Sequence, residues 1–462
     1  MMNLKKSIAK IFSANVIQLI TGLIIGFWLP NVTTINGYAN IKTYTLLVSY
    51  IGFLHLGFID GLYIKYGGKK EKEIDKKELK GEYYFLLIFQ FIISVLSCSI
   101  SLLAKNIIVC LFSLTILPVM VSAFYRYYYQ AIGDFKKYSI IMYLYSITYL
   151  ISNVFLIFIL KSDNYILYSS CTILAYFISS ILFHISFMKK LKNIKPIINK
   201  SKIIKIIKVG FFILLGNLSI VGLFSIDKWF IKLFFTNKEF AYYSFAISML
   251  NIINTLVSAI SIVFYNYLFI NNTRDKINKI KKYLMCLGGA ASTSFFIISI
   301  IVKMFVSKYV QSLDIISVTF SVFPYMILIN ALYANLYKVN KNEKKYLKVV
   351  LLMLLISIIY NIVALILFKS PLFIAVATVL TMFTWTIYSS KDLNNVDLTL
   401  KTVIYLLVLT ISFITLSHIC NNIVGMFIYF VIFIVDSIVF GDINFKEMFH
   451  DFFKKKKIEG EK

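Results

Sequence analysis

Long apolar runs, separated by short polar or charged segments, make up most of the sequence. Fourteen of these runs reach about 17 to 25 residues, the length that an α-helix needs to cross the hydrocarbon core of a bilayer. The pattern predicts an all-α, polytopic membrane protein with about 14 transmembrane helices. The predicted spans are 11–30, 43–64, 83–104, 107–124, 139–160, 165–188, 209–226, 242–265, 283–302, 315–337, 349–368, 371–389, 402–420 and 423–439.

The first run raises the question of a cleaved signal peptide, because the basic segment MMNLKKSIAK precedes it. The run covers about 20 residues, which is enough to cross a bilayer. No small-residue cleavage site follows it. We therefore expect residues 11–30 to remain as the first transmembrane helix.

Lysine and arginine residues alternate between rich and poor connections along the predicted spans. The amino terminus, every second connection and the carboxy-terminal tail together hold 39 of the 48 cations. Because cytoplasmic segments carry the excess of Lys and Arg, both termini are predicted to be cytoplasmic. The nine cations on the other side are Lys42, Lys105, Lys161, Lys228, Lys232, Lys238, Lys303, Lys308 and Lys369.

Composition excludes most soluble folds, since 59% of the 462 residues are apolar and only 15% are charged. A net charge of +27 would suggest nucleic-acid binding in a soluble protein, but here the cations lie between apolar runs. The basic runs 69–80, 189–208 and 454–457 are interpreted as topology signals near anionic headgroups, and no nucleic-acid partner is expected. In 189–208, isoleucines interleave with lysines, which also fits an amphipathic helix on the membrane surface.

The basic segment 189–208 also divides the chain into predicted parts. Residues 1–188 are expected to form an N-terminal six-helix bundle and 209–390 a C-terminal one, joined by this basic cytoplasmic linker. Residues 391–462 are expected to add a two-helix hairpin and a basic cytoplasmic tail. Two bundles of the same orientation fit a pseudo-two-fold axis along the membrane normal.

No residue pattern points to a metal, a cofactor or catalysis. The five cysteines lie in or beside apolar runs without a CxxC spacing, and the four histidines lack metal-ligand spacing. The rival from another class is a membrane enzyme, such as a polysaccharide polymerase or a glycosyltransferase. Such enzymes need a cluster of acids, bases or metal ligands, whereas every predicted outer connection has about a dozen residues or fewer. An enzyme is therefore not expected.

Ionisable residues near membrane depth are few, and each is a candidate for function. Asp60 lies near the cytoplasmic end of the second span, close to Lys65, and is assigned either to coupling or gating or to an interfacial salt bridge. Asp227 and Lys228 end the seventh span near the outer interface, and Lys232 follows one turn later. Asp227 is a coupling or gating candidate and the two lysines are substrate-binding candidates, with a snorkelling cap as the alternative.

Five further residues stand out inside or at the ends of the spans. Arg126, at the cytoplasmic end of the fourth span, is a substrate-binding candidate or a topology anchor. Asp436 and His55 are interpreted as packing residues. Pro118 and Pro324 fall inside the fourth and tenth spans and predict kinks there.

Three stretches carry a resemblance to a known family. GFIDGLYIKYGGKK (57–70), YYYQAIGDFKKYSIIMYLYSI (127–147) and IDKWFI (226–231) are similar to segments of the polysaccharide-export flippases. Their superfamily also holds multidrug and toxic-compound extruders and the peptidoglycan-precursor flippase. The chain resembles this family over nearly its whole length. It differs at the end of the first span, where Trp28-Leu29-Pro30 replaces a sequence that carries a cation in the family.

The resemblance implies two six-helix bundles around a central cavity that opens alternately to the two sides of a bacterial inner membrane. The implied substrate is an undecaprenyl-pyrophosphate-linked oligosaccharide used to make O-antigen, capsule or exopolysaccharide, and Arg126 would contact its pyrophosphate. Expected partners are this substrate and membrane lipids, with a polysaccharide polymerase and chain-length proteins as further candidates.

Two rivals come from the same superfamily. A multidrug extruder would carry an amphipathic cation and would need an acidic cavity, but acids inside the spans are few, mainly Asp60 and Asp436. A peptidoglycan-precursor flippase is disfavoured by the missing cation at the end of the first helix. The sequence therefore favours the oligosaccharide flippase among the three.

Overall fold

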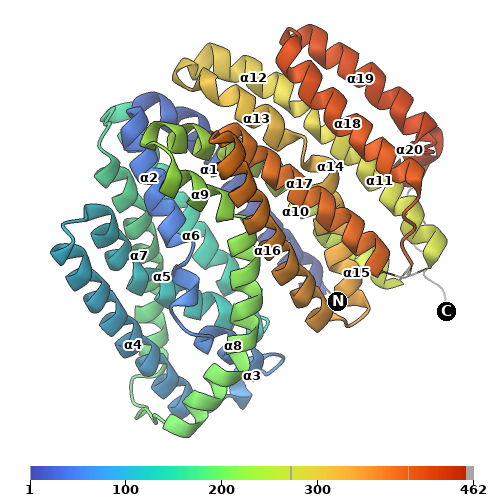
Figure 1. Cartoon of the computed structure of the whole chain (residues 1–462). Coiled ribbons are helices and arrows are strands. Elements are labelled where there is room, and N and C mark those ends of the chain that lie inside the picture. The colour runs from blue at the N-terminus through green and yellow to red at the C-terminus, as the bar shows by residue number, and fades with distance from the viewer. Residues whose placement is uncertain (1, 271–272, 394, 454–462) are drawn as a thin grey trace. The chain divides into compact units, whose positions relative to one another are not determined.

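The computed structural model describes residues 2–270, 273–393 and 395–453, and all regular elements in these ranges are helices (Figure 1). Side chains are described throughout these ranges except at 2–12, 14, 15, 256–267, 269, 270, 449 and 451–453. The basic run 454–457 lies outside the described residues. The chain divides into two compact units, Met1–Ser244 and Phe245–Lys462.

Ten helices of the described chain are long and apolar enough to cross a membrane. Two further pairs of helices pass the same test together but are bent, which gives up to twelve candidate spans. An all-α polytopic membrane protein is thereby confirmed. The ten are α4 (Lys76–Leu103), α5 (Ile107–Ala131), α6 with η3 (Phe135–Ile159), α7 (Tyr165–Lys190), α8 (Lys200–Leu223), α11 with α12 (Arg274–Phe305), α16 (Glu343–Phe368), α17 (Pro371–Asp392), α18 (Leu400–Ile419) and α19 (Asn422–Val439).

Each candidate span coincides with a run that the hydropathy pattern predicts. The two predicted runs that remain, 11–30 and 242–265, fall within α1 (Met2–Val32) and α10 (Asn237–Ile270). The number of fourteen spans therefore stays a prediction, while the described residues contain ten to twelve candidate spans.

The second predicted span is not one continuous helix, contrary to the sequence pattern. The helix α2 (Ile35–Val48) and the short η1 (Ile51–Phe53) are bent by 51° from α3 (Phe58–Tyr66). At the break, Gly57 has φ = 87°, and a Cβ there would lie 2.4 Å from the backbone nitrogen of Phe211. Only glycine combines this left-handed backbone with so close an approach.

The tenth predicted span is also broken, as its proline predicts. The residues 307–320, which form η4 (Ser307–Ser312) and α13 (Leu313–Phe320), are bent by 48° from 323–339. Pro324 lies in the first turn of α14 (Phe323–Ile327), where its missing N–H is tolerated. The kink at Pro324 is confirmed, whereas Pro118 lies inside α5 without dividing it.

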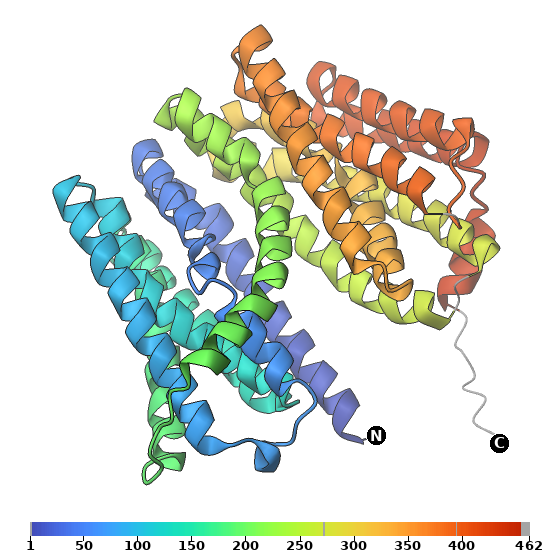
Figure 2. The same cartoon turned by 60° about the horizontal axis from the view of Figure 1, so that its bottom comes forward.

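The first unit is a bundle built around α5. Its neighbours are α4, α7, α6, α2 and α3, while α1 packs along α6 (Figures 1 and 2). The core at one end of this bundle is aromatic and includes Phe58, Tyr83, Phe124, Tyr125 and Phe187. Rings such as those of Tyr83 and Phe124 meet at a centroid distance of 4.9 Å, and such pairs add to the stabilisation from burial alone.

The second unit has its own packing. The helix α11 (Arg274–Ser292) lies against α14, α13 lies against α17 and α18, and α18 pairs with α19. Between α14 and α17 the chain continues through η5 (Leu328–Tyr333), α15 (Ala334–Val339) and α16. The last described helix is α20 (Phe445–Phe453).

The predicted amphipathic helix over 189–208 is wrong in its first half. The helix α7 ends at Lys190, residues 191–199 are not helical, and α8 begins at Lys200. Pro196 has no N–H to continue a helix, and the side chain of Lys80 donates to the carbonyls of Leu191 and Ile194 at 2.9 and 2.8 Å. Two carbonyl groups of this segment thus accept from a side chain of α4, and its Ile197 N–H donates to the Lys77 carbonyl of α4.

The two compact units do not coincide with the two predicted bundles, because α8 and α9 (Ile226–Phe234) fall in the first unit. The contact of α8 with α3 explains this placement. A Cβ on Gly210 would lie 1.9 Å from the Gly57 oxygen, and one on Gly61 2.1 Å from the Ile206 oxygen. The division into two compact units does not test whether the spans form two repeated sets of six, so the division into six-helix bundles stays a prediction.

The glycine contact between α3 and α8 gives a stability prediction. Gly210→Ala places a methyl group inside backbone atoms of α3, so we expect a loss of about 1–3 kcal/mol in the free energy of unfolding, measured by thermal unfolding in detergent. Gly22→Ala is the control, because a Cβ at Gly22 meets nothing within 4 Å. Equal stability of the two variants would contradict the close approach.

Candidate functional site

The helix α9 carries three of the predicted site residues and is anchored to the end of α2. Between α8 and α9 the chain breaks at Ser225, whose hydroxyl lies 2.5 Å from the Tyr50 hydroxyl. The indole N–H of Trp229 donates to the same Tyr50 oxygen at 3.0 Å. These contacts hold the first turn of α9 beside the break that follows α2.

Asp227 is buried and hydrogen-bonded rather than exposed at an interface. Its Oδ2 accepts from the hydroxyl of Tyr243 at 2.7 Å, and its Oδ1 accepts from the backbone N–H of Lys228 at 2.7 Å. The side chain is 4% exposed. The alternative of a snorkelling cap is therefore wrong for Asp227, since its carboxylate is turned inward.

Lys228 is brought together with a lysine that sequence analysis assigned only to topology. The ammonium groups of Lys228 and of Lys42 in α2 repel each other, and the carboxylate of Asp227 attracts Lys228. Both lysines are partly buried, and the ammonium of Lys42 lies 5.0 Å from the centroid of the Tyr38 ring. Lys42, Lys228 and Asp227 thus form a group of ionisable side chains, two basic and one acidic, which we call the α2–α9 cluster.

Lys232 turns in another direction. Its ammonium donates to Asn237 Oδ1 at 2.9 Å and lies 5.2 Å from the centroid of the Phe240 ring. Both partners lie in the first turns of α10. These contacts connect Lys232 with the connection to α10 rather than with Asp227.

Asp60 and His55 meet at the break between α2 and α3. Asp60 is 3% exposed, and its Oδ2 lies 3.8 Å from Nε2 of His55. The backbone N–H of Gly57 donates to His55 Nδ1 at 3.0 Å, so Nε2 faces the carboxyl group. A continuous helix would turn these two side chains apart, and the break at Leu56 and Gly57 brings them together.

Arg126 lies on α5, the helix that packs against α3. Its Nε atom is buried and has no hydrogen-bond acceptor among the described residues. Arg126 and Asp60 both interact electrostatically with the hydroxyl of Tyr127. The centroids of the Tyr127 and Tyr63 rings lie 5.9 Å apart. Arg126, Asp60 and Tyr127 thus converge where α3 meets α5, and a guanidinium N–H there is available to an anion.

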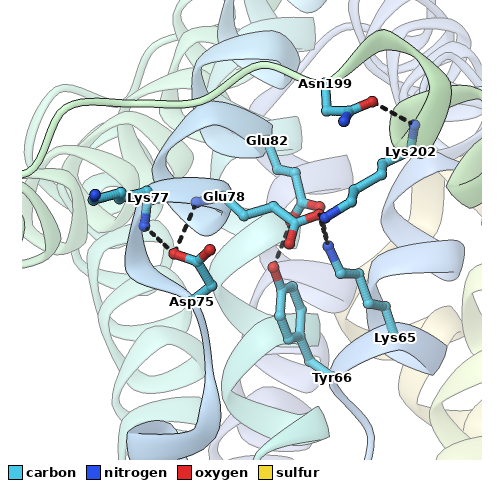
Figure 3. Close-up of polar contacts among 8 residues, drawn as sticks. All are labelled: Lys65, Tyr66, Asp75, Lys77, Glu78, Glu82, Asn199 and Lys202. Atoms are coloured by element: carbon cyan, nitrogen blue, oxygen red, sulfur yellow. Dashed lines mark hydrogen bonds and ion pairs between the residues drawn. The ribbon is translucent and has the colours of Figure 1, made fainter.

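A third group of charges joins α3, α4 and α8 (Figure 3). Lys65 lies 2.7 Å from Glu78 and 2.5 Å from Glu82, and Lys202 lies 3.3 Å from Glu78. The hydroxyl of Tyr66 donates to Glu82 at 2.5 Å. Lys65 therefore pairs with acids of α4, and the proposed salt bridge of Asp60 near Lys65 is not the one that forms.

Capping residues position this network. The side chain of Asp75 accepts from the backbone N–H of Lys77 at the start of α4, and that of Asn199 accepts from the N–H of Lys202 at the start of α8 (Figure 3). Such caps satisfy the free N–H groups of a first helical turn. Two lysines and two glutamates balance each other, so the network joins helices rather than attracting an anion.

The part of the chain that the structure describes contains no candidate metal site. No three side chains of His, Cys, Asp or Glu come together there in a way that could hold an ion. The candidate site residues thus form two clusters, both within the first unit. One is the α2–α9 cluster, and the other, where α3 meets α5, contains His55, Asp60, Arg126 and Tyr127.

These features define a class: a polytopic α-helical membrane protein whose broken spans bring charged side chains together. No protein-family model matches the sequence. No curated protein matches it either.

Solved structures do share its fold. A structure of the lipid II flippase MurJ in an inward closed conformation matches with a TM-score of 0.69 at 14% identity, covering 96% of this chain and 99% of that one. A crystal structure of MATE in complex with MaL6 matches with a TM-score of 0.54 at 13% identity, covering 84% and 96%. An inward-facing multidrug resistance MATE transporter matches with 0.53 at 14%, covering 82% and 98%. The chain therefore shares the fold of these three solved structures.

The hydrogen bond that Tyr243 donates to Asp227 gives a second prediction. Tyr243→Phe leaves a buried carboxylate oxygen without its donor, so we expect the free energy of unfolding to fall by about 1–3 kcal/mol. Chemical denaturation in detergent measures it, with the exposed Tyr388→Phe as control. If both variants match the parent, the carboxylate does not depend on Tyr243.

Proposed function

We propose that this protein is a flippase that carries an undecaprenyl-pyrophosphate-linked oligosaccharide from the cytoplasmic to the outer leaflet by alternating access, for surface polysaccharide biosynthesis. Its transporter fold and its likeness to a structure named as a lipid II flippase support a transport role. The polysaccharide polymerase and chain-length proteins are proposed partners.

The proposed architecture adds two spans to the twelve candidate spans of the structure. The helices α1 and α10 supply the two spans that bring twelve to fourteen, arranged as two six-helix bundles around a central cavity with α18 and α19 as an added pair. The excess of Lys and Arg in alternate connections supports cytoplasmic termini. The membrane in this proposal is the bacterial inner membrane.

The observation that carries the substrate class is that three basic side chains, Lys42, Lys228 and Arg126, outnumber the two acids in the same groups, Asp227 and Asp60. Moving a pyrophosphate through hydrocarbon is costly, because its oxygens lose water without gaining partners. Lys228 lies beside the Asp227 carboxylate and interacts electrostatically with Lys42, and Arg126 presents a buried Nε that no described acceptor engages. Guanidinium and ammonium groups pair well with phosphate oxygens, and the polyprenyl tail stays in lipid.

The carboxylates are proposed to couple or gate this movement. Asp60 faces His55, and Asp227 faces Tyr243 and Lys228. Both acids lie beside helix breaks, where a change of charge alters the packing of two short helices at once. Lys232 contacts the beginning of α10 and is proposed as a peripheral substrate contact.

A multidrug exporter of the same fold is the second candidate. The likeness to MATE structures favours it, and so does the burial of three acids, Asp60, Asp227 and Asp436. An amphipathic cation would pair with these acids, whereas the lysines beside Asp227 would repel it.

Deleting the gene in its host tests the proposed function. The lipid-linked oligosaccharide is expected to accumulate in the cytoplasmic leaflet and the surface polymer to disappear, with plasmid-borne gene as control. Mass analysis of the trapped lipid identifies the sugar. Unchanged polymer together with increased drug sensitivity would instead support the exporter, and precursor in the outer leaflet that fails to polymerise would support a polymerase.

Replacing cations of the two clusters tests the substrate contacts. Lys228→Gln and Arg126→Gln each remove a charge-assisted contact worth about 1.5–3 kcal/mol, so translocation should slow by about 10- to 100-fold. The measurement is flipping of lipid-linked oligosaccharide in proteoliposomes at matched insertion. Lys303→Gln, at an exposed position of α12 (Ser294–Phe305), is the control. Full activity of both variants would assign Lys228 and Arg126 to packing or topology.

A further inference from the structure

Asp436 is a buried acid that neither cluster contains. It lies on α19, one turn before the helix ends at Val439, and it is 3% exposed. Neither of its carboxyl oxygens has a hydrogen-bond partner among the described side chains and backbone. Two other buried acids are compensated, since Asp227 accepts two hydrogen bonds and Glu82 contacts Lys65 and Tyr66.

Two tyrosine hydroxyl groups on α18 and α19 have hydrogen-bond partners other than Asp436. On α18 the hydroxyl of Tyr405 lies 3.1 Å from that of Ser437, the residue after Asp436. On α19 the hydroxyl of Tyr429 donates to the Gly289 carbonyl of α11 at 3.3 Å. These groups join α11, α18 and α19 without serving the Asp436 carboxyl.

The cations of the neighbouring helices are committed to another acid. Lys282 of α11 and Lys401 of α18 approach Asp442 at 3.9 and 3.4 Å. Asp442 lies just beyond α19 and its side chain is 50% exposed. The same three helices therefore pair the exposed acid and leave the buried one without a cation.

Other ionisable groups on these helices pair elsewhere, since Arg274 of α11 pairs with Asp397, Lys279 of α11 pairs with Glu447, and His418 of α18 lies 3.8 Å from Asp314. Cys286 of α11 and the two tyrosines named above are neutral donors or acceptors at ordinary pH. On α12, which also packs against α19, Phe296 contacts Tyr429, and the ionisable residue Lys303 is exposed. An ionised carboxylate at position 436 would thus be buried without compensation, whereas a neutral acid costs far less there.

We propose that Asp436 is a proton-binding site. Its carboxyl group holds a proton while α19 is packed against α11 and α18. When this interface opens near the end of α19, the carboxyl O–H bond breaks, the proton passes to water, and a hydrated carboxylate remains. Closing the interface reverses the transfer. This site is independent of the substrate clusters and therefore of the proposed function.

The sign of the pH dependence follows from this exchange. The packed interface binds one proton more than the open one, so raising the pH favours the open form and lowering it favours the packed form. Asn at position 436 resembles the neutral acid in shape and cannot ionise. It is expected to keep the interface packed at every pH.

Thermal unfolding of the full chain in lipid nanodiscs, from mildly acidic to mildly alkaline pH, tests the proposal. Parent and Asp436→Asn should have similar midpoints at the acidic end, and the parent midpoint should fall further as the pH rises. Asp442→Asn is the matched control and should keep the parent's additional fall. Other titrating groups contribute equally to all three profiles. Parallel profiles for the parent and Asp436→Asn would overturn the proposal.

A second measurement on the parent protein covers the case in which Asp436→Asn fails to fold. A hydrophobic carbodiimide reacts with protonated carboxyl groups, and mass analysis of the peptide containing Asp436 reports its labelling. Labelling should be present at acidic pH and fall about tenfold per pH unit once the group ionises. No label at position 436 at any pH, while another buried carboxyl is labelled, would overturn the proposal.

Discussion

The constraint on which the structure depends is that backbone N–H and C=O groups inside a membrane must find partners within the protein. Continuous helices meet this demand by themselves, and breaks in them do not. In the first unit, breaks occur between η1 and α3 and between α8 and α9, and at each one side chains take over. The imidazole of His55 accepts from Gly57 N–H, and the Ser225 hydroxyl donates to the Val221 carbonyl. The charged side chains Asp60 and Asp227 gather at the same places, because a broken helix already supplies polar surroundings.

Close packing between helices supports these breaks. In lipid there is little hydrophobic drive between helices, so association depends on small residues that let backbones approach. Gly57, Gly61 and Gly210 provide such a contact between α3 and α8, and the network of Lys65, Glu78, Glu82 and Lys202 fixes the ends of the same helices. The bend after Gly57 is therefore held from two sides, and this places α8 in the first compact unit.

Hydropathy and charge alternation predicted the helices well but could not predict their breaks. A 20-residue apolar average is unchanged by a single left-handed residue, so the segment 43–64 looked continuous although α3 begins anew after Gly57 within it. Only Pro324 carried a local signal, its missing N–H. For the same reason the sequence did not show the neighbours of the site residues. His55 meets Asp60 because of the break, and Lys42 interacts electrostatically with Lys228, far from it in the sequence. Arg126, Asp60, Asp227, Lys228 and Lys232 were predicted as candidates from sequence because ionisable residues near membrane depth are rare.

The described charges differ in how completely they are compensated, and this difference separates structural from exchangeable groups. Glu82 has a cation and a hydroxyl, and Asp227 has two donors, so the burial of either carboxylate is compensated in this structure. Arg126 keeps one buried N–H without an acceptor, and Asp436 keeps two oxygens without a donor. A buried polar group without a partner is stabilised by a ligand that pairs with it, which is an anion for the guanidinium and a proton for the carboxylate. Binding free energy is then available at these positions, whereas at the compensated ones it is already used in holding the helices together.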